Sequence, residues 1–254
     1  PRPVVQEDVD DVGWTFQRAI STWGTGPDEV FYYPNAVAFE PDGSLWVADA
    51  NGGPRLLHFP ADSTAPDIIL SGLFGDGPAQ FQTINGIAID EDGNLYVSDA
   101  EGSAIQVITR TGESVREFEA REPQGMLIIG DTLYVGERGA VARFSLEGDL
   151  LGRWGSEGRE VGQFEFITGL SASEDTLFVA DALLNRVQAL SLETGEVQWV
   201  VGTPPANMND GNRTFDVAAD VMYSEYGLYV LEGLGSTVQV LDSTEATITA
   251  TPSG

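Results

Sequence analysis

The sequence predicts an all-β fold, a β-propeller whose blades are four-stranded antiparallel sheets. The first observation is a phrase that occurs five times, made of leucine, an aromatic residue, valine, any residue and an acid. The copies are Leu45–Asp49, Leu95–Asp99, Leu133–Glu137, Leu177–Asp181 and Leu228–Glu232. Successive copies begin 50, 38, 44 and 51 residues apart. A repeat of about 40–50 residues with several strands per repeat is typical of propellers.

The second observation is the order of strands and turns around each phrase. Asn85–Asp90 alternates apolar and polar residues, and an Asp-Gly turn at residues 92–93 leads into Leu95–Asp99. Ile105–Ile108 and Ser114–Phe118 follow, separated by a second turn that contains Gly112. Four short strands joined by tight turns form one antiparallel sheet, and their two-faced alternation requires sheets packed on both sides.

The same order recurs along the chain. The first unit has strands near Ala36–Phe39, Leu45–Ala48, Leu56–Phe59 and Asp67–Leu70, and the third, fourth and fifth units run over Gly125–Trp154, Gly169–Val201 and Val221–Thr249. Linkers rich in Gly, Pro and Phe separate the units, at Gly24–Pro34, Gly72–Gly86 and Gly155–Gly169. We expect each linker to cross from the outer strand of one blade to the inner strand of the next.

Two units resemble NHL repeats, the units of a family of six-bladed propellers. The segments are PNAVAFEPDGSLWVADANGGPRLLHF from Pro34 and INGIAIDEDGNLYVSDAEGSAIQVI from Ile84. The resemblance implies six blades, whereas five complete units are present. Gly13–Gly24 is similar to an outer strand and would complete a composite sixth blade together with Thr244–Thr249. We therefore expect a single domain over residues 13–250, with six blades favoured over five, after an acidic extension at residues 1–12.

The composition narrows the function. Forty acids and twelve bases give a net charge of −28, and every base is arginine. Such a charge repels phosphate backbones and anionic lipids, so nucleic-acid binding is disfavoured. The acids either keep the protein soluble or form a docking face for a basic partner. Cysteine is absent, which excludes disulfides and thiolate chemistry, and no apolar run is long enough to cross a bilayer.

The acid that ends each repeated phrase invites comparison with a metal ligand. An acid at a strand end followed by small residues more commonly accepts backbone N–H groups in the turn. The resemblance further implies an ion pair with an arginine that opens the next strand, which is present as Arg55 and Arg186 and absent from the other three units. We expect these acids to stabilise turns, and we expect no bound metal and no cofactor.

A second ring lies where the inner strands begin, at the mouth of the central channel. By alignment it contains Asn35, Asn85, Gln124, Thr168 and Ala219, and Asp220 beside the last is the fifth candidate for ligand binding. Enzymes with similar propellers hold a divalent ion at this place. A ring with at most one carboxylate is a poor cage for a hard cation, so polar packing or a weak ligand site is the favoured interpretation.

The remaining candidates concern contacts with other proteins. The lone histidine, His58, alternates with apolar residues and is interpreted as a half-buried strand residue. Tyr32 and Tyr33 exceed what one blade linker needs, and exposed tyrosines on a rim suit protein binding.

The sequence therefore predicts a non-catalytic interaction scaffold that binds another protein or a membrane-bound complex. We expect an accessory subunit that is extracytoplasmic, either periplasmic or extracellular. Its membrane attachment would come through a partner or through an N-terminal anchor outside the given sequence. The alternative is a metal-dependent lactonase, esterase or lyase that acts at the channel mouth.

Overall fold

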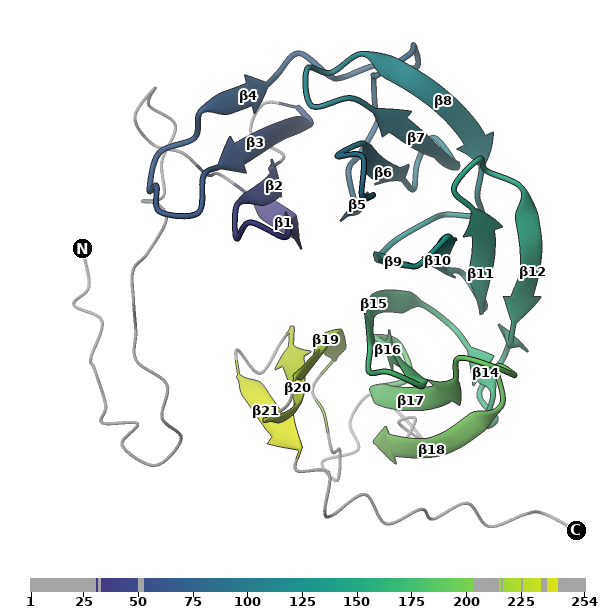
Figure 1. Cartoon of the computed structure of the whole chain (residues 1–254). Coiled ribbons are helices and arrows are strands. Elements are labelled where there is room, and N and C mark those ends of the chain that lie inside the picture. The colour runs from purple at the N-terminus through teal and green to yellow at the C-terminus, as the bar shows by residue number, and fades with distance from the viewer. Residues whose placement is uncertain are drawn as a thin grey trace, which may run out of the picture.

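The computed structural model describes residues 31, 33–49, 53–202, 215, 217–224, 226–233 and 237–241. Five antiparallel sheets are arranged around a central channel, each with its first strand innermost (Figure 1). The predicted propeller of small antiparallel blades is confirmed. Among these residues no helix is long and apolar enough to span a membrane.

The blades follow the chain in order. Blade 1 contains β1 (Pro34–Phe39), β2 (Leu45–Asp49), β3 (Arg55–Phe59) and β4 (Ile68–Leu70). Blade 2 contains β5 (Gly86–Ile89), β6 (Leu95–Asp99), β7 (Ala104–Ile108) and β8 (Ser114–Glu119). Blade 3 contains β9 (Met126–Ile129), β10 (Thr132–Glu137), β11 (Ala140–Ser145) and β12 (Leu150–Trp154). Blade 4 contains β15 (Ile167–Ala172), β16 (Thr176–Asp181), β17 (Arg186–Ser191) and β18 (Val197–Gly202), and blade 5 contains β19 (Ala218–Ser224), β20 (Gly227–Glu232) and β21 (Val238–Leu241). A short parallel pair, β13 (Ser156–Glu157) and β14 (Gln163–Phe164), lies within the linker between blades 3 and 4.

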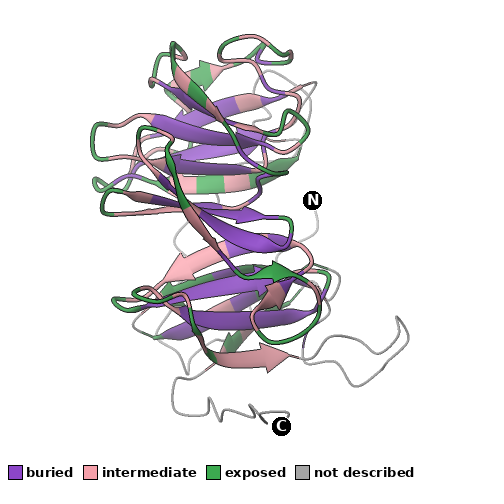
Figure 2. Ribbon diagram, turned by 90° about the vertical axis from the view of Figure 1, so that its right-hand side faces the viewer, coloured by how far each residue is buried: buried purple, intermediate pink, exposed green. Residues whose placement is uncertain are grey.

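The repeated phrase forms the second strand of every blade. Every residue of β6 and β16 is buried, because neighbouring sheets cover both faces of these strands. Burial on both faces explains why the phrase is apolar along its length rather than alternating. Between blades 1 and 2, for example, Trp46 and Leu56 pack with Ile87 and Val97. Figure 2 shows this burial along the middle of the blades.

Glycine allows the inner strands to approach one another closely. Gly86, Gly125 and Gly169 occupy equivalent places in blades 2, 3 and 4, one residue after the ring at the channel mouth. A Cβ atom on Gly125 would lie 2.5 Å from the carbonyl oxygen of Thr168, and one on Gly86 would lie 2.4 Å from that of Gln124. The backbone of the following blade therefore occupies the space that a side chain would need.

The described residues form five blades, and a gap separates blade 1 from blade 5 (Figure 1). Six blades were predicted in preference to five. The described residues form five blade sheets, and the fifth has three strands. The two segments expected to complete the ring, Gly13–Gly24 and Thr244–Thr249, lie outside the described residues, as does the acidic extension at residues 1–12.

Candidate functional site at the channel mouth

Four of the five predicted ring residues line one cavity at the centre of the propeller. The cavity has a volume of about 310 Å³ and contains Asn35, Asn85, Thr168 and Asp220, one from each of blades 1, 2, 4 and 5. Gln124, the member from blade 3, is buried beside the cavity and accepts a hydrogen bond from the Asn85 amide at 3.0 Å. The structure therefore brings these side chains together at the channel mouth, and ligand binding there stays a prediction.

Most ring side chains are already engaged in contacts between blades. The Asn35 amide donates to the carbonyl oxygen of Ile84 in the linker to blade 2. Asn85 donates to Gln124 of blade 3, and the Thr168 hydroxyl donates to the carbonyl oxygen of Ala218 in blade 5 at 3.5 Å. These bonds join blade 1 to blade 2, blade 2 to blade 3 and blade 4 to blade 5. They support polar packing as one role of the ring.

Asp220 differs from the other ring members. It stands where blades 2 to 4 have glycine, and its carboxylate accepts the N–H of Val221 at 2.8 Å. The side chain keeps access to the channel, yet protein atoms close around it. This loss of solvation raises the pKa of Asp220, against the opposing effect of the Val221 hydrogen bond.

Because its pKa is raised, ionised Asp220 destabilises the fold at neutral pH, so removing its charge should increase stability. A carboxyl group whose pKa is higher in the folded than in the unfolded state favours folding when protonated and loses that contribution as pH rises through the folded value. We therefore expect Asp220→Asn to raise the melting temperature at pH 7, with the gain disappearing below about pH 4, near the ordinary aspartate value. Thermal melts between pH 3 and pH 8 measure this.

Asp42 provides the matched control. Its hydrogen bonds with Ser44 lower its pKa, so its ionised form stabilises the fold at neutral pH and loses that contribution on acidification. Asp42→Asn should lower the melting temperature at pH 7. Equal effects of the two variants would contradict the assignment.

The channel donors do not fit a tightly held divalent ion. Calcium takes six to eight oxygen ligands, and magnesium sites depend on carboxylates, whereas this cavity offers one carboxylate and amides already engaged in hydrogen bonds. Within the part of the chain that the structure describes, no group of three or more His, Cys, Asp or Glu side chains is placed to hold a metal.

Four of the acids that end the repeated phrase, Asp49, Asp99, Glu137 and Asp181, accept backbone N–H groups, and Glu232 accepts the side chains of Thr237 and Gln239. Asp99 accepts the N–H groups of Gln82, Thr83 and Gly102. Only Gly102 lies in the adjacent turn, whereas the other two belong to the linker that enters the blade. Asp181 repeats this pattern with Glu165, Phe166 and Leu184. Each acid therefore fixes the linker to its blade as well as the turn.

The expected arginine partners are found only in part. Arg55 pairs with Asp49, with its Nη2 atom 2.5 Å from Oδ2. Arg186 does not form the corresponding ion pair and instead donates to main-chain carbonyl oxygens in the preceding linker. Glu137, expected to have no arginine, pairs with Arg153 of the outer strand β12 at 2.6 Å. Sequence spacing missed this pair because the two residues meet across three strands.

His58 is more buried and better connected than the sequence suggested. Its Nδ1 atom lies 2.6 Å from the Asp67 carboxylate, and its Nε2 atom lies 3.6 Å from the carboxylate of buried Glu40. Its ring packs on Trp46 with centroids 5.0 Å apart. The histidine thus joins strands within blade 1.

Of the two rim tyrosines, Tyr33 is 67 % exposed and Tyr32 lies outside the described residues. The backbone N–H of Tyr33 binds the Asp49 carboxylate, which places Tyr33 at the end of blade 1 where the linkers cross. Phe74, in the next linker, is 63 % exposed.

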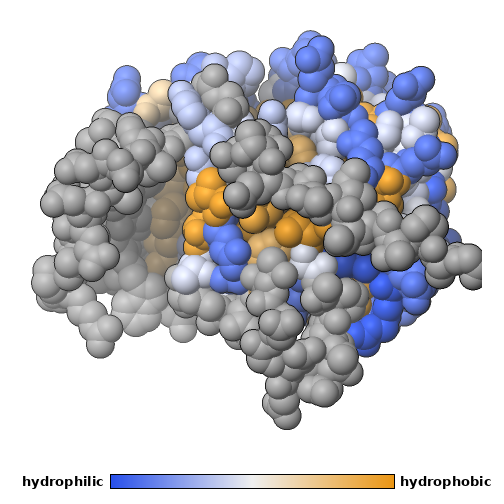
Figure 3. Space-filling view, turned by 90° about the horizontal axis from the view of Figure 1, so that it is seen from below, coloured by the Kyte–Doolittle hydropathy of each residue, from blue (hydrophilic) through white to orange (hydrophobic). Residues whose placement is uncertain are grey.

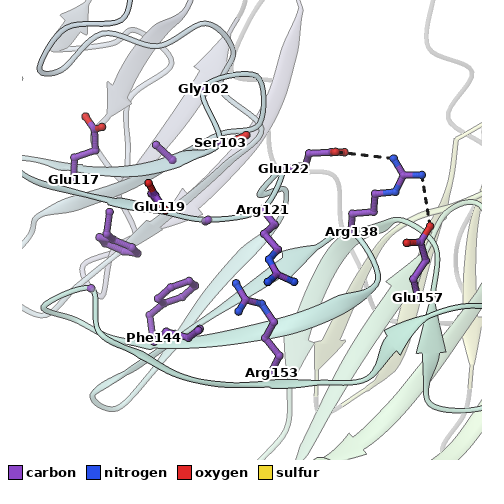
Figure 4. A pocket seen from close by; sticks show the side chains of 15 residues that line it. Gly102, Ser103, Glu117, Glu119, Arg121, Glu122, Arg138, Phe144, Arg153 and Glu157 are labelled. Atoms are coloured by element: carbon purple, nitrogen blue, oxygen red, sulfur yellow. Dashed lines mark ion pairs between the residues drawn. The ribbon is translucent and has the colours of Figure 1, made fainter.

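A larger cavity of about 1150 Å³ lies between blades 2 and 3 (Figure 4). Its wall contains Arg121, Arg138 and Arg153, which come from a linker, a turn and an outer strand. No sequence motif unites these residues, so sequence analysis did not identify them. Their only common signal is that they are basic residues in a strongly acidic chain.

Comparison with known proteins supports the family and the fold. Residues 81–108 match the family model described as NHL repeat, so the identification made from the sequence is confirmed at blade 2. No curated protein matches the sequence.

Among solved structures, hydrazine synthase of Kuenenia stuttgartiensis is similar with a TM-score of 0.56 and 15 % identity, covering 86 % of this chain and 68 % of that one. A nidogen/laminin complex gives 0.61 and 16 %, covering 84 % and 77 %. A catalytically inactive virginiamycin B lyase from Staphylococcus aureus gives 0.61 and 17 %, covering 88 % and 69 %. At these identities the similarities concern the fold alone.

Proposed function

We propose that this NHL-repeat propeller is a non-catalytic scaffold that binds another protein through the face where its linkers cross. We define the crossing-loop face as the linkers into the inner strands together with the turns between second and third strands. Exposed large apolar side chains on this face carry the proposal: Tyr33, Phe74, Val161 and Leu183. Single exposed apolar residues are ordinary on protein surfaces, but these four share one face with the channel mouth.

The rest of that face suits recognition rather than turnover. Its linkers are fixed by buried acids such as Asp99 and Asp181, so the exposed side chains are held on a rigid support. A preorganised surface loses little entropy on binding. The net charge of −28 favours a partner with a basic face. We further propose that the protein works outside the cytoplasm as an accessory subunit of an envelope or membrane-bound assembly.

Cross-linking mass spectrometry on protein purified natively from its source cells tests this proposal. We expect one co-purifying protein, with cross-links on the crossing-loop face. Tyr33→Ser combined with Leu183→Ser should weaken that association at least about tenfold, as loss of interface anchors does. Val115→Ser, on the outer strand β8, is the control and should leave it unchanged. A native protein that migrates alone, or equal losses in both variants, would contradict the scaffold.

We also propose that a sixth blade closes the ring. Blade 5 turns an apolar face toward the gap, formed by Met222, Leu231, Val238 and Val240, all exposed. In Figure 3, which views the molecule from below, apolar surface is visible between the residues drawn in grey. Such a face is buried in every other interface between blades. Residues 13–24 and 244–249 are the proposed covering strands.

Hydrogen exchange tests the closure. We expect slow exchange of the backbone amides in residues 13–24 and 244–249, because strand amides are protected. Exchange at the rate of an unstructured peptide in both segments would contradict a composite sixth blade.

A second candidate is favoured by Asp220 alone. A carboxyl group with a raised pKa inside a cavity suits acid–base work, as the alternative of a lactonase, esterase or lyase would require. The channel donors do not form a metal cage, so this activity would depend on Asp220. Lactone or ester turnover that Asp220→Asn abolishes without unfolding the protein would place this function above the scaffold.

A further inference from the structure

The cavity between blades 2 and 3, here called the arginine groove, has the features of a binding site that is separate from the channel. It is lined by Arg121, Arg138 and Arg153 together with Phe118 and Phe144. In Figure 4 the side chains of Arg121 and Arg153 point toward one another across the groove. Three of the twelve bases of the chain thus gather in one place.

One buried carboxylate contacts the backbone of Arg121 and the side chain of Arg153. Glu137, fully buried, accepts the backbone N–H of Arg121 at 2.8 Å. The same carboxylate accepts hydrogen bonds from Nε and Nη2 of Arg153, at 2.6 and 3.1 Å. This pairing leaves Nη1 of Arg153 outside the ion pair. The Arg153 guanidinium is therefore positioned before any ligand arrives, which lowers the entropic cost of binding one, whereas for Arg121 only the backbone is fixed.

Within the described part of the chain, the Arg121 side chain has no hydrogen-bond, ion-pair or aromatic partner. Every other arginine among the described residues has a carboxylate, a carbonyl oxygen, an aromatic ring or another polar contact. The chain has forty acids, so a shortage of carboxylates does not explain this. Two guanidinium groups that face one another repel, and an anion between them would convert that repulsion into charge-assisted hydrogen bonds.

The remainder of the groove indicates what carries the anion. Phe118 and Phe144 lie with ring centroids 5.2 Å apart, and Leu150 extends the apolar wall. The glutamates that also line the groove are Glu117, Glu119, Glu122 and Glu157. Their charge opposes a doubly charged phosphate more than a singly charged carboxylate. Arg138 pairs loosely with Glu122 and Glu157, at 3.9 and 3.6 Å, and closes the end of the groove.

We propose that the arginine groove binds a monocarboxylate carried on an aromatic or apolar body. The carboxylate lies between Arg121 and Arg153, and the apolar body packs on half-buried Phe118, which buried Phe144 supports from behind, and on exposed Leu150. The carboxylate can belong to a free organic acid or to the end of a peptide. This proposal does not rest on the proposed scaffold function. The groove shares Arg121 and Arg138 with a linker and a turn of the crossing-loop face and extends from there along the outer strands β8 and β12, away from the channel.

Titration with 3-phenylpropionate tests the proposal, with 3-phenylpropionamide as the neutral probe of the same shape and inorganic phosphate as the dianion. Amide NMR shifts report the binding site. We expect saturable binding of the carboxylate with shifts at residues 118–122 and 150–153, and at least about tenfold weaker binding of the amide, because hydrogen bonds to charged groups are lost. A peptide that ends in phenylalanine, compared with its C-terminal amide, shows which source of carboxylate is preferred.

Variants of equal charge separate the site from the general field of the protein. Arg121→Gln should weaken binding at least about tenfold, whereas Arg159→Gln, in a different linker, should change it less than about twofold. Arg121→Lys keeps the charge without the planar fork and should lie between these values. Four results would each overturn the proposal. They are equal losses of affinity in Arg121→Gln and Arg159→Gln, equal binding of the acid and the amide, tighter binding of phosphate than of the carboxylate, and binding that does not saturate.

Discussion

Replacing Gly125 with alanine should lower the free energy of unfolding by about 2–3 kcal/mol, the upper part of the range for overpacked sites. For a domain of this size we expect a fall in melting temperature of roughly 4–12 °C. The added Cβ would lie 2.5 Å from the carbonyl oxygen of Thr168, with Gly169 also close behind it. Both obstacles are backbone atoms of blade 4, which cannot rotate away as a side chain can. The two inner strands must therefore separate.

Gly233→Ala is the control for this experiment. A Cβ atom there would lie 3.4 Å from Ala219 and from Val217, which is ordinary contact. We expect its melting temperature to change by no more than about 2 °C, the size of a glycine-to-alanine effect on the unfolded chain. Equal effects of the two substitutions would show that the close approach of blades 3 and 4 does not limit stability.

The fold was predictable from the sequence because its strongest signals are local. The repeated phrase, the Asp-Gly turns and the period of the linkers all lie within one blade, and they located the strands of blades 1 to 4. The contacts between blades are not local in the sequence. Nothing in the sequence distinguishes Gly125 from the other glycines, of which the chain has thirty in all. Its role follows from the position of the blade 4 backbone beside it.

The same distinction applies to the candidate sites. The ring at the channel mouth follows from equivalent positions in successive repeats, so alignment brought Asn35, Asn85 and Thr168 together. The hydrogen bonds of Asn35 and Thr168 to the next blade were not predictable, because their acceptors are backbone atoms about fifty residues away. The arginine groove escaped detection for a stronger reason. Arg121 and Arg153 occupy no equivalent positions, and Glu137 unites them only in three dimensions.

Removing the carboxylate of Asp181 should cost about 3–5 kcal/mol, because it leaves several buried donors without an acceptor. Asp181 is fully buried and accepts the N–H groups of Glu165, Phe166 and Leu184 at 2.9, 3.1 and 3.2 Å. Its charge also favours the cationic form of Arg186, whose pKa burial lowers. Asp181→Ala thus removes the acceptor of linker and turn amides and, at the same time, the negative charge that stabilises buried Arg186. Chemical denaturation monitored by tryptophan fluorescence measures the loss.

Two further variants distinguish the role of the acceptor from that of the charge. Glu174→Ala removes an exposed acid from the same blade and should change stability by less than about 0.5 kcal/mol. Asp181→Asn keeps one oxygen acceptor but turns an NH₂ group toward backbone donors, so it should recover only part of the loss. If Asp181→Asn were as stable as the unmodified protein, the linker amides would need no carboxylate. The acid that ends each repeated phrase would then be a requirement of the turn alone, and the fixed crossing-loop face would lose its main support.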